Sequence, residues 1–320
     1  MNRIHQGETM HRRVRIRNRR TDPPALRSCG RMNRKFLARI ASAAVFAGLL
    51  ILAGCREKEP VKPEPGDGIP VPEGWKLVWN DEFEGPPIDP QKWGFEVNGK
   101  GGGNNELQYY TDRDTNVFVE NGALVIQALE ERYTGSDGTR QYTSGRIRTR
   151  YRGDWTYGRF EIRAKLPFGQ GIWPAIWMMP TDNIYGSWPA SGEIDIVELL
   201  GHQPAKVYGT IHYGGAGSLH ASSGASFTLP SGSFADDFHL FTFEWDSTDM
   251  RWFVDDSLYS TKTQAVWYTS SAQRPAPFNR RFYLILNVAV GGNWPGSPNA
   301  TTTFPQRMAV DYVRVFQREP

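Results

Sequence analysis

The segment Gly192-Glu193-Ile194-Asp195-Ile196-Val197-Glu198-Leu199 sets three carboxylates among β-branched and other apolar residues. Such residues favour an extended strand, in which successive side chains point to opposite faces. Glu193 and Asp195 then share one face, but strict alternation puts Glu198 on the other, where burying a carboxylate is costly. We therefore predict a β-bulge, one extra residue near Ile196-Val197, that returns Glu198 to the face of the other two.

The spacing within this strand gives the three carboxylates a chemical meaning. The Cα atoms of residues 193 and 198 lie about 13 Å apart once the bulge is included, and inward-leaning side chains bring their carboxyl groups to about 5–6 Å. Paired carboxyl groups at that separation are typical of retaining glycosidases. The alternative is a half-exposed strand whose carboxylates are simply solvated. Because three like charges on one face repel one another, we favour a functional cluster.

Four further segments accompany the carboxylate strand. They are residues 157–167 (YGRFEIRAKLP), 171–178 (GIWPAIWM), 291–296 (GGNWPG) and 310–315 (VDYVRV). Together with the pattern Glu-x-Asp-x-x-Glu at residues 193–198, they resemble glycoside hydrolase family 16, and within it the laminarinase-like endo-β-1,3-glucanases. The resemblance covers residues 74–318, which we predict to form one catalytic domain.

The residues of this domain also predict an all-β fold on their own. Residues 159–166 alternate charged and apolar side chains with the period of two of a half-buried strand. Trp245 and Trp252 lie in similar patterns and are expected in the core. Glycine, proline and Asn/Asp clusters punctuate these runs, which implies two stacked antiparallel sheets, a sandwich or jelly roll. The family resemblance implies a concanavalin A-like β-jelly roll with a substrate cleft on its concave face.

The basic residues of the chain are concentrated near its N-terminus. Residues 1–55 carry twelve Arg and Lys against Glu8 and Asp22, a net charge of +10. The whole chain has a net charge of +3, so the remainder sums to −7. The protein without this segment is therefore acidic, which argues against nucleic acid as a partner.

Residues 32–54 have the pattern of a lipoprotein signal peptide. Three basic residues precede an apolar run at 40–52 that is too short to span a membrane, and Leu-Ala-Gly then leads to Cys55. This ending resembles a bacterial lipobox in which Cys55 is lipidated; an ordinary secretory signal is the alternative. We predict that Met32 is the true start, so that residues 1–31 are a mis-assigned extension.

Residues 55–73 are rich in proline and charge, with little to bury, and predict an extended tether. We expect an exported protein that contacts a membrane only through a lipid on Cys55. Because residue 56 is Arg, and not the Asp that retains lipoproteins at an inner membrane, the resemblance implies delivery to the outer membrane if the cell has one. The only other cysteine is Cys29, so the domain has no disulfide and no Cys-ligated metal.

Aromatic residues in two turns predict sugar binding. Trp188 and Trp294 lie in glycine- and proline-rich turns, where an exposed ring suits the apolar face of a pyranose. Trp173 and Trp177 have the same parity in their strand, so either can face the cleft. The resemblance favours Trp173.

The resemblance also implies polar residues in the cleft. These are Asn105, Arg146, His212 and Asn287. Each has a plain alternative as a turn cap, a surface charge or an ordinary strand residue.

No cofactor is expected for catalysis. The six histidines have none of the i, i+4 or His-x-His spacings that are typical of a zinc site. A structural calcium ion is a separate expectation from the resemblance, on the convex side of the domain. Its ligands would be Glu82, the backbone carbonyl of Gly122, and Asp311, and oxygen ligands of this kind suit calcium.

The resemblance assigns the catalytic roles. Glu193 is the nucleophile and Glu198 the acid/base of a retaining double displacement, in agreement with the rule that neighbouring carboxylates cannot both ionise freely. Asp195 lies between them, can hydrogen-bond one of them, and by its charge raises the pKa of Glu198. The expected substrate is a laminarin-type or mixed-linkage β-glucan, cut internally by a monomer.

Two other functions remain open on the same fold, since a fold does not fix a function. One is a non-catalytic β-glucan-binding protein, which the presence of all three carboxylates disfavours. The other is a hydrolase of galactans such as agar or carrageenan. An acidic domain mildly disfavours sulfated substrates.

Overall fold

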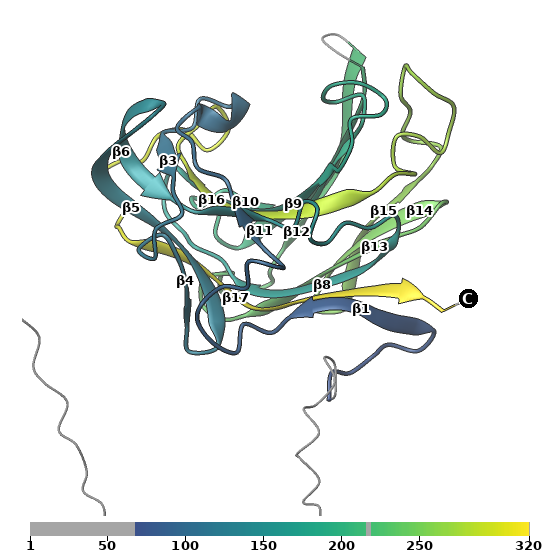
Figure 1. The fold of residues 1–320 in the computed structure, drawn as a ribbon, viewed down its shortest axis with the longest axis horizontal. Helices are drawn as coiled ribbons and strands as arrows, with labels where there is room; N and C mark the ends of the chain where they lie inside the picture. Colours follow the sequence, from purple (N-terminus) through teal and green to yellow (C-terminus); the bar gives the residue numbers. More distant parts are fainter. Residues whose placement is uncertain (1–67, 216–218, 320) are drawn as a thin grey trace, which may run out of the picture. The chain divides into compact units, whose positions relative to one another are not determined.

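The computed structural model describes residues 68–215 and 219–319, which form two β-sheets stacked face to face (Figure 1). The predictions for Cys55, the signal peptide and most of the tether lie outside the described residues. Among those described, no helix has the length and apolar character needed to cross a membrane. The prediction of an all-β jelly roll with two sheets is confirmed.

One sheet has seven strands, and its neighbours pair antiparallel throughout. In spatial order they are β12 (His220–Thr228), β11 (Lys206–Gly214), β10 (Glu193–Leu199), β9 (Ile172–Pro180), β16 (Phe282–Val290), β7 (Arg146–Arg148) and β2 (Gly94–Phe95). The predicted carboxylate segment is therefore β10, and it lies next to the centre of this sheet.

The other sheet has ten strands. Its main order is β15 (Ser257–Thr263), β14 (Asp249–Val254), β13 (His239–Trp245), β8 (Gly158–Lys165), β17 (Gln306–Arg318), β5 (Ala123–Gly135), β6 (Gly138–Ser144) and β3 (Gln108–Tyr110). In addition, β1 (Trp75–Asp81) pairs with β17 and β4 (Val117–Glu120) with β5. Pairing is antiparallel except between β3 and β6, which run parallel. A short 3-10 helix, η1 (Gly101–Gly103), precedes β3.

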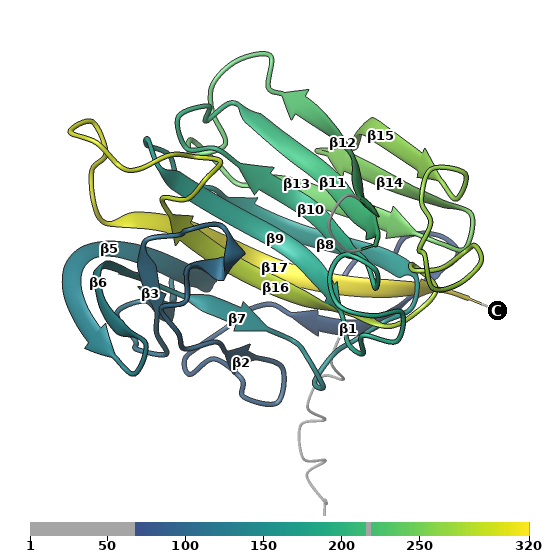
Figure 2. The same cartoon turned by 90° about the horizontal axis from the view of Figure 1, so that it is seen from above.

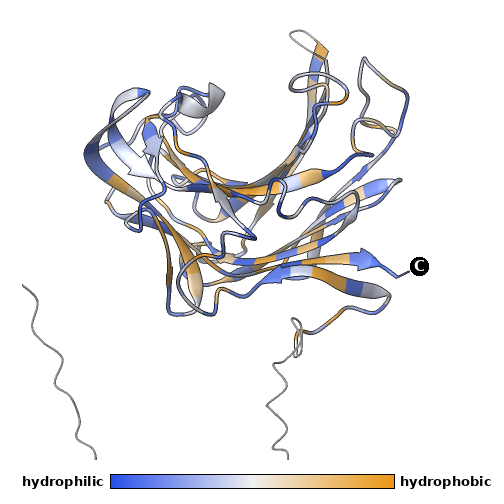
Figure 3. Ribbon diagram, viewed as in Figure 1, coloured by the Kyte–Doolittle hydropathy of each residue, from blue (hydrophilic) through white to orange (hydrophobic). Residues whose placement is uncertain are grey.

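The core lies between the two sheets. Phe160 and Ile162 of β8 are fully buried, as the period of two predicts, and every residue of β16 is buried. Trp245 and Trp252 are each only 1% exposed, which confirms them as core residues. Figure 3 shows apolar and polar residues interleaved along the strands, the pattern of sheets with one face in the core.

The outer face of the seven-stranded sheet is flanked on two sides (Figure 1). In Figure 1, β11 and β12 rise on one side of it, while β3, β5 and β6 rise on the other. Figure 2 looks down on the strongly twisted strands β9, β10 and β11 between these two sides. The outer face of β10 therefore lies at the bottom of a concave surface.

Candidate active site

The pairing of β10 with its neighbours contains the predicted β-bulge. Asp195 faces Thr210 on β11, but Glu198 faces Tyr208, so two residues of β10 oppose the single residue Gly209. The register on β9 shifts at the same place. The extra residue moves Glu198 to the face of Glu193 and Asp195, and the prediction is confirmed.

A tryptophan from the opposite sheet supports the bulge. Trp252 of β14 donates its indole N–H to the backbone carbonyl of Asp195 at 2.9 Å, inside the core. Gly209 makes room for this ring, because a Cβ at residue 209 would lie 2.5 Å from the indole Cδ1 of Trp252. The bulge is thus held by a buried hydrogen bond that no spacing in the sequence revealed.

We expect Trp252→Phe to disturb the active site as well as the fold. Losing the indole N–H leaves the carbonyl of Asp195 buried without a donor, which costs about 1–3 kcal/mol of folding stability. The loosened bulge should lower kcat about tenfold. Thermal melts and kinetics on a β-glucan measure both effects.

Trp245→Phe is the matched control for this prediction. Trp245 is equally buried, and its indole donates to the carbonyl of Phe278, away from the bulge. It should lose similar stability with kcat unchanged. Equal losses of kcat in the two variants would contradict a specific role for Trp252.

The three carboxylates open into one cleft of about 1100 Å³ on the concave face. On five neighbouring strands, alternate residues line it, as the pleat requires. They are Arg146 and Arg148 of β7, Trp173, Ala175, Trp177 and Met179 of β9, Glu193, Asp195 and Glu198 of β10, Thr210 and His212 of β11, and Asn287 and Ala289 of β16. Only β10 changes parity along its length, at the bulge.

Each glutamate of β10 accepts a hydrogen bond from a tryptophan indole. Trp188 donates to Glu193 Oε2 at 2.8 Å, and Trp173 donates to Glu198 Oε1 at 3.0 Å. These bonds fix the two carboxyl groups in place without supplying a compensating positive charge. Two of the predicted sugar-binding rings therefore also position the carboxylates.

Burial dominates the protonation of the carboxylates. It raises the pKa of Glu193 to about 8, with repulsion from Asp195 as the next cause, and it raises the pKa of Asp195 to about 8. Burial, then the charges of Asp195 and Glu193, raise the pKa of Glu198 well above its ordinary range. The predicted influence of Asp195 on Glu198 is thus present, but burial is the larger cause.

The environment distinguishes the two glutamates. His212, the Trp188 indole and Arg146 limit the rise in the pKa of Glu193, but burial and the charge of Asp195 outweigh them. At neutral pH the cluster therefore retains protons, and Glu193 has the more cationic surroundings. Acid-assisted nucleophilic displacement needs one protonated and one ionised carboxyl group, and the cationic neighbours of Glu193 make it the more easily ionised member of the pair.

Most of the predicted sugar-binding residues lie in the cleft. Trp173, Trp188, Trp294, Arg146, His212 and Asn287 line it. Asn105 does not, and its neighbour Asn104 lines the cleft instead. Asn105 has a positive φ of 57° and donates its side-chain amide to Asn293 at 2.9 Å, so its side chain is engaged within the loops.

Both tryptophans of β9 face the cleft, so the preference for Trp173 over Trp177 was too narrow. The indole of Trp177 donates to Asn287 Oδ1 at 2.7 Å. The guanidinium of Arg146 stacks 4.8 Å from the centre of the Trp177 ring. Trp177 thus holds two of the predicted polar residues in place.

Several cleft residues were not predicted. Glu96 pairs with Arg146 at 3.0 Å and with Arg148 at 2.8 Å. The alternation Arg146-Ile147-Arg148 would have placed both arginines on one face, but nothing in the sequence links them to residue 96. Glu106 lines the cleft and accepts hydrogen bonds from Gln108 and from the Tyr110 hydroxyl, at 2.6 and 3.1 Å.

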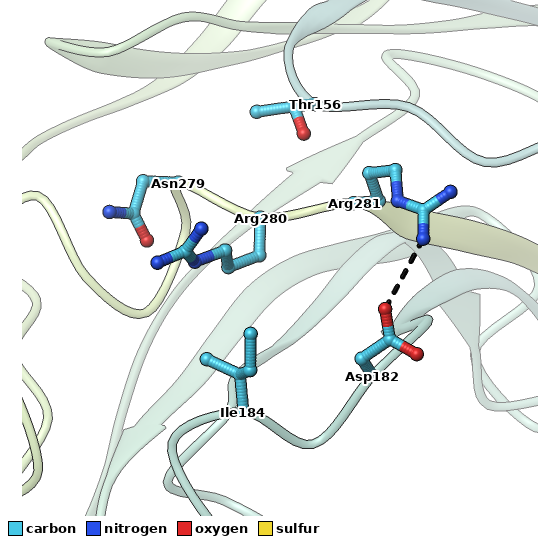
Figure 4. Close-up of a pocket in the computed structure, with 6 residues that line it drawn as sticks. All are labelled: Thr156, Asp182, Ile184, Asn279, Arg280 and Arg281. Atoms are coloured by element: carbon cyan, nitrogen blue, oxygen red, sulfur yellow. Dashed lines mark hydrogen bonds and ion pairs between the residues drawn. The ribbon is translucent and has the colours of Figure 1, made fainter.

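A second, smaller hollow lies outside this cleft. Its volume is about 170 Å³, and Thr156, Asp182, Ile184, Asn279, Arg280 and Arg281 line it (Figure 4). Arg281 pairs there with Asp182 at 3.3 Å and with Asp154 at 3.1 Å. None of the predicted site residues lines it, so the large cleft is the candidate active site.

The strand register brings the predicted calcium ligands to neighbouring positions. On one side, Asp81 of β1 pairs with Val313 of β17, and Glu82 is the next residue after Asp81. On the other, Leu124 of β5 pairs with Val310, the residue before Asp311, and Gly122 lies two residues before Leu124. These oxygen donors are of the type that suits calcium.

Both predicted calcium-binding carboxylates, however, already have a guanidinium partner. Arg314 donates to both oxygens of Glu82, at 3.0 and 2.7 Å, and Arg163 donates to Asp311 at 2.6 Å. Binding of calcium therefore requires that these arginines release the carboxylates.

Comparison with known proteins gives consistent matches. Residues 104–314 match the model of "Glycosyl hydrolases family 16". The chain is 47% identical over 257 residues to a "Beta-glucanase" of Rhodothermus marinus, covering 76% of this chain and 85% of that protein. It is 43% identical over 266 residues to "Glucan endo-1,3-beta-glucosidase A1" of Niallia circulans, covering 78% of this chain but only 39% of that longer protein.

A solved structure matches the fold as well as the sequence. The laminarinase catalytic domain of Thermotoga maritima superposes with a TM-score of 0.70 at 44% identity, and the match covers 78% of this chain and 100% of that domain. The part of the chain that matches is thus about the size of a complete catalytic domain.

Proposed function

The chain belongs to glycosyl hydrolase family 16, and on that premise we propose that it cleaves internal β-1,3-glucosidic bonds in laminarin-type or mixed-linkage β-glucans, with retention of configuration. One observation carries the proposal. The bulge in β10 presents Glu193 and Glu198 on one face of an aromatic cleft, and each is held by an indole N–H. A paired-carboxylate site of this kind is the apparatus of a double displacement.

The reaction follows from the two environments. Glu198 donates its proton to the glycosidic oxygen as the carboxylate of Glu193 attacks the anomeric carbon, so the leaving chain departs with a hydroxyl group. A covalent glycosyl-enzyme forms on Glu193. Glu198, now a base, takes a proton from water as that water attacks the same carbon and releases Glu193. Two inversions give net retention.

The lining of the cleft suits a β-glucan. Trp188 and Trp294 are 46% and 41% exposed, which is unusual for such large rings and provides apolar surface for pyranose faces. Arg146, Asn287 and His212 provide polar contacts for sugar hydroxyls nearby. An exposed, aromatic cleft favours a polymer over a small charged substrate.

A substrate panel tests the proposal. Purified protein is incubated with laminarin, lichenan, agarose and carrageenan, and the product sizes are measured, with Glu193→Gln as the inactive control. Internal cleavage of laminarin gives a ladder of oligosaccharides. Binding of laminarin without products would favour the binding-protein alternative, and products from agarose or carrageenan alone would favour a galactanase.

We also propose that the domain binds a structural calcium ion through Glu82, the Gly122 carbonyl and Asp311. The family resemblance and the oxygen donors support this. Excess EDTA should lower the melting temperature of the protein, and added calcium should restore it, because a ligand that binds only the folded state stabilises it. A melting temperature that EDTA leaves unchanged would exclude the ion.

We propose further that the protein is exported and held at the cell envelope by a lipid on Cys55, at the outer membrane where there is one, and the pattern at residues 32–55 supports this. On expression in a bacterial host, the protein should partition into the detergent phase. Cys55→Ala should release it in soluble form. Unchanged partitioning of this variant would rule out the anchor.

A further inference from the structure

Three side chains that are scattered in the sequence converge in the active site. The side-chain ligand atoms of Glu193, Asp195 and His212 all lie within 4.8 Å of one another. His212 Nε2 is 3.3 Å from Asp195 Oδ2 and 3.9 Å from Glu193 Oε1. Strand pairing explains the convergence, because Glu193 faces His212 directly across β10 and β11.

One of these atoms is buried without a hydrogen bond. Asp195 is only 3% exposed, and its Oδ2 has no hydrogen-bond partner among the described residues. The nearby His212 Nε2 does not satisfy it, although the two atoms are 3.3 Å apart. A buried carboxylate oxygen that lies 3.3 Å from an imidazole nitrogen and has no hydrogen-bond partner is short of a ligand that could bind both atoms.

The distances suit a transition-metal ion. Zinc ligands at 2.0–2.1 Å in a tetrahedron are roughly 3.3 Å apart, which matches the separation of His212 Nε2 and Asp195 Oδ2. Glu193 Oε1 lies 3.9 Å from His212 Nε2, so it has to move inward to join them, while the indole of Trp188 holds the other oxygen, Oε2. One imidazole and two carboxylates leave a fourth position open to the cleft.

A neighbouring histidine supplies the outer contact that metal-binding imidazoles usually have. His212 Nδ1 lies 3.0 Å from His220 Nε2, and the two rings stack with centroids 5.2 Å apart. When Nε2 of His212 binds a metal, Nδ1 carries the proton and donates it to His220. Such contacts fix the tautomer and orientation of a ligand ring.

We infer that Glu193, Asp195 and His212 form a binding site for a divalent transition-metal ion, such as Zn²⁺, whose occupation blocks the catalytic centre. Two carboxylates and one imidazole neutralise the charge of the ion. The imidazole disfavours Ca²⁺ and Mg²⁺, which take oxygen ligands in larger numbers. Metal on Glu193 engages the nucleophile, so metal and substrate exclude each other.

Calorimetric titration of the full chain with ZnCl₂ tests the site directly. His212→Ala should weaken Zn²⁺ binding by more than about 100-fold, since it removes a ligand. His220→Phe, which keeps an aromatic ring but removes the acceptor, should weaken it by about 10- to 100-fold. All other zinc-binding groups of the protein are common to the variants, so the differences report this site.

His202→Ala is the matched control, because His202 is an exposed histidine on the turn after β10. It should bind Zn²⁺ within twofold of the wild type. CaCl₂ and MgCl₂ should give no binding that depends on His212. If circular dichroism shows that His212→Ala is unfolded, Asp195→Asn replaces it and should show the same loss of Zn²⁺ affinity. Zn²⁺ affinity within threefold of the wild type in the folded ligand variant would overturn the inference.

The inhibition of catalysis by Zn²⁺ rests on the proposed β-glucanase function, whereas the binding of Zn²⁺ does not. Zn²⁺ should inhibit laminarin hydrolysis with a half-inhibition concentration that follows its dissociation constant, and saturating laminarin should raise that concentration. An inactive protein that still binds Zn²⁺ through His212 would refute the β-glucanase function alone. An active protein with no His212-dependent Zn²⁺ binding would refute the metal site alone.

Discussion

Replacing Glu193 by Gln is expected to lower kcat on laminarin by about 10,000-fold or more, because the amide cannot form the glycosyl-enzyme. Binding of laminarin should persist. The amide oxygen of Gln can still accept the hydrogen bond that Trp188 donates to Glu193 Oε2. The sugar-binding rings of the cleft are also unchanged, so a calorimetric titration should give a dissociation constant close to that of the wild type.

Asp195→Asn is the control for this variant, since it removes a neighbouring charge without touching the nucleophile. It should be damaged less than Glu193→Gln. The stereochemistry gives a further check, because double displacement requires the β-anomer as the first product of the wild-type enzyme. Detection of the α-anomer by NMR before mutarotation would refute both the role of Glu193 and the retaining mechanism.

The sequence was sufficient for the carboxylate strand because one physical conflict lay within eight residues. Alternation would have buried Glu198 in an apolar core, and a bulge is the inexpensive way to avoid that cost. The structure contains this bulge. What local reasoning could not reveal is its support: Trp252 lies 57 residues away, and its burial was predictable while its contact with Asp195 was not.

Loops limited the prediction of the cleft walls. In a strand, parity alone places Trp173 and Trp177 on one face, and both are in the cleft. In the loop around η1, backbone dihedrals replace parity, and the positive φ of Asn105 sends its side chain to Asn293 while Asn104 lines the cleft. The His212 and His220 pair was hidden because the zinc-site rules that we applied consider spacing along the chain, and these residues meet across a strand pair.

Replacing Glu198 by Ala should separate the two halves of the reaction. On laminarin, whose leaving group needs a proton, we expect kcat/KM to fall by about 100- to 10,000-fold. On an aryl glycoside with an activated leaving group, formation of the glycosyl-enzyme needs little acid assistance, so the loss should appear mainly in its hydrolysis. Azide needs no general base, and it should restore turnover in part and give a β-glycosyl azide.

The pH profile distinguishes an acid/base role for Glu198 from a merely structural one. Burial, followed by the charges of Asp195 and Glu193, raises its pKa well above the ordinary range, so the residue keeps its proton to a higher pH than a free glutamic acid does. Wild-type kcat/KM should therefore fall on the alkaline side, where the acid is lost. In Glu198→Ala, assayed on the activated glycoside, that alkaline fall should disappear, since no proton is left to lose. If Glu198→Ala still loses kcat/KM on the alkaline side and azide does not raise its turnover, the acid/base is another residue of the cleft, with Asp195 the nearest candidate.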